Sequence, residues 1–112
     1  VYAQYGEPSM PRPRKRRLCR LFEGDRVFKP RSIPMFELET IRLELSELEA
    51  MRLCDLDGYD QERAGERMAV SRGTVQRLLK SGRRKVLQAL LQSRALLIEE
   101  GAHHEDLYSD AG

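Results

Sequence analysis

A run of apolar and small residues between Gln61 and Lys80 limits what this chain can fold into more than any other feature. Counted from Gln61 as position 1, the apolar positions are 4, 8, 10, 15 and 18, which hold Ala64, Met68, Val70, Val75 and Leu78. Two helices that cross steeply over a three-residue turn bury these positions and need a small residue at position 5, which is Gly65. Position 9, where the turn favours a positive φ angle, holds Ala69, at a cost on the order of 1 kcal/mol. The spacing predicts a helix-turn-helix.

The residues before this motif predict a first helix. Ser46 is followed three residues later by Glu49, a spacing that allows a reciprocal capping box. Asp57-Gly58 supplies a residue that tolerates a left-handed helix end. We therefore expect a helix that begins at Ser46 and ends near Gly58. Its expected buried face consists of Leu48, Met51, Leu53, Cys54 and Leu56.

The two helices of the motif also have recognisable ends. Asp60 is a suitable cap for a second helix that runs to Met68, and Ser71 for a third that continues to about Ser93. The expected fold class is mainly α, a three-helix helix-turn-helix domain with a long third helix.

Two short segments predict a small β element. Residues 41–45 alternate apolar and polar side chains, and residues 95–99 contain a second short aliphatic run. Because neither strand is stable alone, we expect the two to pair, either within one chain or between two chains of a dimer. The run from Leu96 to Ile98 is expected to be exposed and to offer a dimer interface.

The charged residues are segregated along the chain. Residues 10–31 hold nine Lys or Arg and two acids, and residues 72–94 hold seven Lys or Arg and no acid. Between them, residues 35–67 hold ten acids and four bases, and the tail from residue 95 has five acids and no Lys or Arg. Two separate basic blocks on a chain of net charge +2 are typical of a surface that binds nucleic-acid phosphates.

Composition divides the chain into four parts. Residues 1–9 are expected to be a leader or an upstream extension without fixed structure. Residues 10–34 begin with the Pro-rich, basic PRPRKRR run and are expected to form a flexible arm and an irregular lead-in. Residues 35–101 are the expected helix-turn-helix DNA-binding domain, and residues 102–112 are an expected acidic, disordered tail.

The helix-turn-helix pattern also identifies candidate contacts to DNA. The second helix of such a motif enters the major groove with its N-terminal half, which gives as base-contact candidates Ser71, Arg72, Gly73, Gln76, Arg77 and Lys80. Arg can donate bidentately to guanine and Gln to adenine, each good pair contributing roughly 1–3 kcal/mol of discrimination. Further residues are expected to contact phosphates or a groove. These are Arg12, Arg14, Lys15, Arg16, Arg17, Thr74, Arg83, Arg84 and Lys85.

Other classes of function find little support in the sequence. It contains no catalytic constellation and no Gly-rich phosphate loop, so we expect no enzyme activity and no cofactor. Cys19 and Cys54 lack a CxxC pair or a nearby His, and His103-His104 lies in the acidic tail, so no metal site is expected. Without a long apolar run or a disulfide framework, the expected location is the cytoplasm, in association with the nucleoid and without membrane contact.

Several motifs together resemble one prokaryotic family. They are MPRPRKRRLC at Met10, FKPRSIP at Phe28, LSELEAMRLCDLDG at Leu45, QERAGERMAVSRGTVQRLLKSGRRKV at Gln61 and ALLIEEG at Ala95. Over most of residues 10–101 the chain is similar to the uncharacterised family known as domain of unknown function 134. Its helix-turn-helix is also similar to region four of bacterial sigma factors. That resemblance implies a DNA-binding regulator that reads a promoter-like element with Arg72 through Lys80.

Three functions are consistent with the sequence. The first is a sequence-specific, homodimeric regulator that binds double-stranded DNA, since two half-sites multiply the limited specificity of one short helix. The second is a protein-interaction module of the transcription machinery, with RNA polymerase as a partner, whose acidic surface from Glu37 to Glu66 depends on Glu47 or Glu49. The third is a sequence-independent nucleic-acid binder that depends on Arg14 to Arg17.

Overall fold

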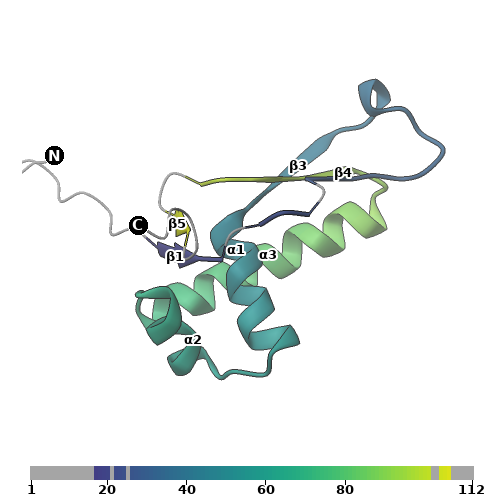
Figure 1. Ribbon diagram of the computed structural model, residues 1–112. Coiled ribbons are helices and arrows are strands. Elements are labelled where there is room, and N and C mark those ends of the chain that lie inside the picture. The colour runs from purple at the N-terminus through teal and green to yellow at the C-terminus, as the bar shows by residue number, and fades with distance from the viewer. Residues whose placement is uncertain (1–16, 21, 25, 102–103, 107–112) are drawn as a thin grey trace, which may run out of the picture.

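Three helices and a small mixed sheet form the body of the protein (Figure 1), which is mainly helical. A computed structural model describes residues 17–20, 22–24, 26–101 and 104–106. The helical elements are the 3-10 turn η1 (Met35–Glu37), α1 (Leu45–Met51), the π-helical turn η2 (Arg52–Leu56), α2 (Gln61–Met68) and α3 (Arg72–Leu91). The strands are β1 (Arg17–Cys19), β2 (Val27–Phe28), β3 (Thr40–Glu44), β4 (Ala95–Glu99) and β5 (His104–Asp106).

The larger sheet has the order β2-β4-β3. Strands β3 and β4 are parallel, with Ile41 opposite Leu96 and Leu43 opposite Ile98. The expected pairing of residues 41–45 with 95–99 is therefore confirmed, and it occurs within one chain. The short strand β2, in a segment that we expected to be irregular, pairs antiparallel with the other edge of β4.

The run from Leu96 to Ile98, which we expected to be exposed and to offer a dimer interface, lies in the central strand β4, and the expected exposure is wrong for Ile98. A central strand has no free edge, and its side chains towards α3 enter the core. Ile98 is 4% exposed, and Leu96 packs against the core cluster. A sequence run of aliphatic residues does not distinguish an exposed strand from a central one, because both are apolar.

A second, two-stranded sheet joins β1 to β5 in parallel, with Leu18 opposite Glu105. Three residues of the acidic tail, for which we expected disorder, thus form a strand. The other expected features of residues 1–16 and 107–112, including most of the basic arm, lie outside the described residues.

The first helix begins one residue before the expected start and has a different cap. The cap is Glu44, whose side chain accepts from the Glu47 backbone while a Glu47 carboxylate oxygen accepts from the Glu44 N–H at 2.9 Å. This is the reciprocal geometry that we expected between Ser46 and Glu49. Ser46 instead lies in the first turn of α1 and is 2% exposed, because β3 leads directly into the helix.

The end of the first helical segment differs from a regular α-helix. Residues Arg52–Leu56 form the wider π-helical turn η2, which shifts every following side chain relative to the 3.6-residue period. Leu53 is buried as expected, but Leu56 is 78% exposed and does not belong to the buried face. Gly58 has a φ angle of +84°, which confirms the expected left-handed residue after the helix.

Helices α2 and α3 have the expected caps. The Asp60 carboxylate accepts from the Arg63 N–H at 2.8 Å, and the Ser71 hydroxyl oxygen accepts from the Thr74 N–H at 3.1 Å. Helix α3 ends at Leu91, two residues before the expected end. Of the five apolar positions of the motif, Ala64, Met68, Val75 and Leu78 are buried, and Val70 packs against the core while partly exposed.

The connection between α2 and α3 is held by backbone contacts. Ala69 adopts the left-handed conformation, with φ 58° and ψ 42°, and the Val70 N–H donates to the Gly65 carbonyl at 2.9 Å. A Cβ atom on Gly65 would lie 2.7 Å from the Val70 carbonyl oxygen. The absence of a side chain at residue 65 therefore lets the chain reverse tightly enough to bring α3 against α2.

Replacing Gly65 with Ala tests this close approach. Gly65→Ala should lower the free energy of unfolding by about 1–3 kcal/mol, because a backbone oxygen must move to admit the methyl group. Gly73→Ala is the matched control, since the nearest atoms to its Cβ would be side-chain ends at 3.8 and 3.9 Å. The control should be neutral or stabilising by up to about 1 kcal/mol in urea denaturation. Equal effects of the two substitutions would contradict the packing described.

Ala69→Gly should change stability in the opposite direction. A left-handed backbone costs an L-residue about 1–2 kcal/mol, and Gly adopts it freely but loses more entropy on folding. We expect a net gain on the order of 0.5–1 kcal/mol, measured as a higher midpoint of urea denaturation. A loss of stability would show that the turn does not need a positive φ angle at this residue.

Candidate nucleic-acid interface

The N-terminal half of α3 presents a polar face to solvent. All six expected base-contact residues are exposed, and they are Ser71, Arg72, Gly73, Gln76, Arg77 and Lys80. The intervening Val75, Leu78 and Leu79 are buried against the other helices, so the helix is fixed with this face outward. One face of α3 thus carries three cations and one amide side chain within three turns.

Local hydrogen bonds order the first turn of this face. The hydroxyl groups of Ser71 and Thr74 lie 3.0 Å apart, and an Arg77 guanidinium nitrogen donates to the Thr74 hydroxyl oxygen at 3.2 Å. Thr74, which is half-buried, is the central residue of this short chain of contacts. The Arg77 side chain is held on the helix surface near the N-terminus of α3.

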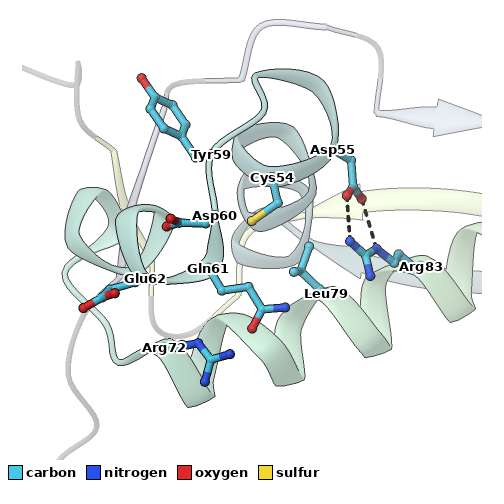
Figure 2. Close-up of a pocket in the computed structure, with 9 residues that line it drawn as sticks. All are labelled: Cys54, Asp55, Tyr59, Asp60, Gln61, Glu62, Arg72, Leu79 and Arg83. Atoms are coloured by element: carbon cyan, nitrogen blue, oxygen red, sulfur yellow. Dashed lines mark hydrogen bonds and ion pairs between the residues drawn. The ribbon is translucent and has the colours of Figure 1, made fainter.

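A shallow cleft of about 480 Å³ lies beside this face, between the start of α2 and α3 (Figure 2). Gln61 at the start of α2 and Arg72 at the start of α3 line it, as do Asp55 and Arg83, which are joined by two N–O contacts of 2.6 and 3.1 Å. The hydrogen bond from Arg83 lowers the pKa of Asp55, and the same bond raises the pKa of Arg83. Arg83, an expected phosphate contact, therefore already has a carboxylate partner.

Cys54 lines the same cleft. Burial raises the pKa of its thiol, and the nearby Asp55 carboxylate adds to the effect. The thiol is therefore protonated at neutral pH, which makes it a poor nucleophile and a poor metal ligand. In the part of the chain that the structure describes, no three His, Cys, Asp or Glu residues gather as a metal site would require.

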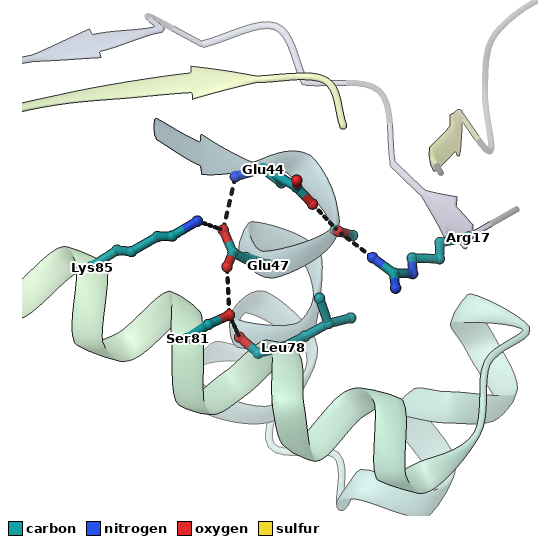
Figure 3. A network of polar contacts seen from close by, with 7 residues as sticks. Arg17, Glu44, Glu47, Leu78, Ser81 and Lys85 are labelled. Atoms are coloured by element: carbon teal, nitrogen blue, oxygen red, sulfur yellow. Dashed lines mark hydrogen bonds and ion pairs between the residues drawn. The ribbon is translucent and has the colours of Figure 1, made fainter. Parts of the chain in front are cut away.

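Lys85, another expected phosphate contact, is part of the fold. Its ammonium group lies 2.8 Å from a carboxylate oxygen of Glu47, whose side chain is 6% exposed (Figure 3). The other Glu47 oxygen accepts from the Ser81 hydroxyl. Glu47 thus joins the N-terminus of α1 to the middle of α3, and Lys85 balances its buried charge.

Of the remaining basic residues expected to contact phosphates, four lie outside the described residues and two within them. Arg12, Arg14, Lys15 and Arg16 lie outside the described residues. Arg17 donates to the Ser46 hydroxyl oxygen at 3.3 Å, beside the N-terminus of α1. Arg84 is exposed on α3.

The cations of α3, together with Arg94 just after it, therefore divide into those that pair with a carboxylate and those that do not. Arg83, Lys85 and Arg94 pair with Asp55, Glu47 and Glu39. No carboxylate among the described residues pairs with Arg72, Arg77, Lys80 or Arg84. This division could not be predicted from the sequence, because the spacing of a cation on a helix does not show whether a distant acid pairs with it. Three of the four cations without a carboxylate partner lie in the N-terminal half of α3.

The fold defines a small, mainly helical protein with a three-stranded mixed sheet and one strongly basic helix face. The chain belongs to the family described as protein of unknown function DUF134, whose model matches residues 8–106. No helix in the described ranges has the length and apolar character needed to span a membrane. No solved structure matches the chain.

Three proteins that are similar to this chain are described as UPF0251 proteins. A UPF0251 protein of Pelotomaculum thermopropionicum is 48% identical over 92 residues, which cover 82% of this chain and 70% of that protein. A UPF0251 protein of Desulforudis audaxviator is 46% identical over 92 residues, which cover 82% of this chain and 60% of that protein. A UPF0251 protein of Caldanaerobacter subterraneus is 41% identical over 106 residues, which cover 92% of this chain and 90% of that protein. The chain thus spans between three fifths and nine tenths of these relatives.

Lys85→Met tests the structural role of this lysine. The substitution keeps the apolar stem but leaves the Glu47 carboxylate buried without its cation, so the free energy of unfolding should fall by about 2–3 kcal/mol. Arg84→Met, one residue earlier and exposed, should change it by less than about 0.5 kcal/mol. Urea denaturation of both variants measures the difference. If both variants were as stable as the parent, Lys85 would be free to contact phosphates.

Proposed function

We propose that this protein binds double-stranded DNA sequence-specifically, as a transcriptional regulator. In this proposal α2, the turn at Ala69 and α3 act as a helix-turn-helix, and the N-terminal half of α3 enters the major groove. The observation that carries it is the tight reversal at Gly65, beyond which one face of α3 exposes three cations that no carboxylate of the described residues pairs with. A convex basic helix face of this kind suits the width of the major groove.

The exposed side chains suggest a division of roles. Arg72 and Arg77 can each donate two hydrogen bonds to a guanine edge, and Gln76 can pair bidentately with adenine. Lys80 and Arg84, one helical turn apart on the same face, are suited to hold phosphates and fix the register. Arg83 and Lys85 have carboxylate partners, so we assign them little direct contact.

The charge distribution also supports a polyanionic partner. The binding energy of such a protein derives largely from the release of counterions when cations neutralise phosphates. Four cations of α3 have no carboxylate partner among the described residues and are available for this, whereas Arg83 and Lys85 already neutralise acids of the fold.

The alternative function, a protein-interaction module with an acidic surface, was expected to depend on Glu47 or Glu49, and both residues are buried. Glu47 is 4% and Glu49 is 5% exposed. Glu47 pairs with Lys85, and Glu49 accepts from Arg52 at 3.0 and 2.6 Å. The hydrogen bond from Arg52 also raises the pKa of that arginine. Neither carboxylate is placed to contact a partner protein.

Selection of bound duplexes from a random pool, at about 150 mM salt, tests the proposal. The parent protein should enrich a defined sequence, and Arg77→Ala should lose preference at one or more positions because a bidentate base contact is removed. Arg42→Ala is the matched control, since Arg42 is exposed on β3 and pairs with Glu99. It should enrich the same sequence as the parent.

Two outcomes would overturn this function. Recovery of DNA without enrichment would indicate sequence-independent binding through phosphates alone. Failure to recover DNA would leave a protein-interaction role through another surface. An equal loss of preference in Arg42→Ala and Arg77→Ala would remove α3 from the reading role while leaving DNA binding intact.

A further inference from the structure

The outward face of α3 changes character along its length. Gln76, Lys80, Leu87 and Leu91 follow one another at spacings of four and seven residues, which places them on one side of the helix. The first two are polar, but Leu87, Leu90 and Leu91 are 56%, 71% and 80% exposed. Such leucines gain nothing from facing phosphates, so this half of the helix needs a different partner from the basic half.

An apolar groove lies next to these leucines. It has a volume of about 400 Å³ and lies between the end of α3 and the sheet, with Phe28 and Leu96 on one side and Val86 and Leu90 on the other. Phe28 is 55% exposed. The groove is at the end of α3 that is far from α2 (Figure 1), and thus away from the proposed reading face.

We propose that a second copy of this chain covers this surface, in a two-fold symmetric dimer. A two-fold interface brings the same patch of both copies together, so the patch must be complementary to itself. The protruding Leu87 and Leu91 and the adjacent groove meet that requirement, because the ridge of each copy can enter the groove of the other. The choice of a second copy as the occupant rests on the proposed DNA-reading function.

The exposed apolar area is of the size that a dimer interface requires at its centre. With roughly 150 Å² for each large apolar side chain, the exposed fractions of Phe28, Leu87, Leu90 and Leu91 amount to about 400 Å² per copy. A stable interface buries about 800 Å² per partner, with an apolar centre and a polar rim. These four side chains therefore supply about half, and the surrounding polar residues supply the rim.

The charges around the groove also permit two copies to approach. Arg94, on its border, is neutralised by Glu39 at 3.0 Å. Lys29 donates to the carbonyl oxygens of Pro30 and Ile33 at 2.9 and 2.6 Å. Three of the four α3 cations without a carboxylate partner among the described residues, Arg72, Arg77 and Lys80, lie towards its other end, so the repulsion between the two copies acts over a longer distance there.

The length of α3 allows the two reading segments of such a dimer to reach successive major grooves of DNA. At a rise of about 1.5 Å per residue, Gln76 lies about 21 Å from Leu90 along the helix. A two-fold axis near Leu90 therefore separates the two reading segments by up to about 42 Å. Successive major grooves on one side of B-DNA are about 34 Å apart, which is within this reach.

The mass of the protein in solution tests the interface. Light scattering after size-exclusion chromatography should give twice the 13.0 kDa of the chain at micromolar concentration. Leu90→Glu and Leu91→Glu should each raise the dimer dissociation constant by about 100-fold or more, because each buries two carboxylates in an apolar interface. Leu56→Glu is the matched control, since Leu56 is 78% exposed on η2, and it should remain dimeric.

Circular dichroism separates loss of dimer from loss of fold, and both interface variants should keep the helical content of the parent. A monomeric parent, or interface variants that stay dimeric, would overturn the proposed interface. A dimeric parent that selects no DNA sequence would instead leave the interface standing and contradict the proposed function. If both hold, the selected site should contain two half-sites, and Leu90→Glu should bind it at least about tenfold more weakly.

Discussion

The tight reversal between α2 and α3 is the constraint on which the rest of the structure depends. Gly65 has no side chain to displace the Val70 carbonyl, and Ala69 accepts a left-handed backbone so that Ser71 can cap α3 at once. These three local features set where α3 starts and which of its faces meets the core. Val75, Leu78 and Leu79 then become buried, and the polar residues between them face solvent.

The rest of α3 consists of three parts that differ in charge and in the pairing of their cations. Near the middle of the helix, Asp55 and the buried Glu47 engage Arg83 and Lys85 and tie α3 to the first helical segment. Towards the N-terminus, Arg72, Arg77 and Lys80 have no such partner among the described residues. Towards the C-terminus, cations give way to exposed leucines beside the groove at Phe28. One helix thus offers a basic surface, an anchored middle and an apolar surface in sequence order.

Much of this fold follows from the sequence because local rules determine it. The caps at Asp60 and Ser71, the small residue at position 65 and the two short apolar segments 41–45 and 95–99 all follow from short-range patterns. The N-terminus of α1 was assigned to the wrong cap because Glu44 and Ser46 each precede a Glu by three residues, and only the end of β3 decides between them. Leu56 was misplaced because a π-helical turn has no signal in hydrophobic periodicity.

The pairing of Lys85 with Glu47 and the two-residue strand β2 depend on contacts between distant segments, which a single sequence does not encode locally. The exposed leucines at the end of α3 do have a signal, since Leu87 and Leu91 continue the spacing of Lys80 rather than that of the buried Leu78.

The most direct test of the account is a backbone amide NMR spectrum of the protein recorded while duplex DNA is added. If α3 reads DNA, the largest chemical-shift changes occur in residues 71–80, at the turn and the N-terminal half of α3, and β3 and η2 change little. Changes concentrated elsewhere in the described chain, or no change with DNA in excess, would contradict the claim that this helix face contacts DNA.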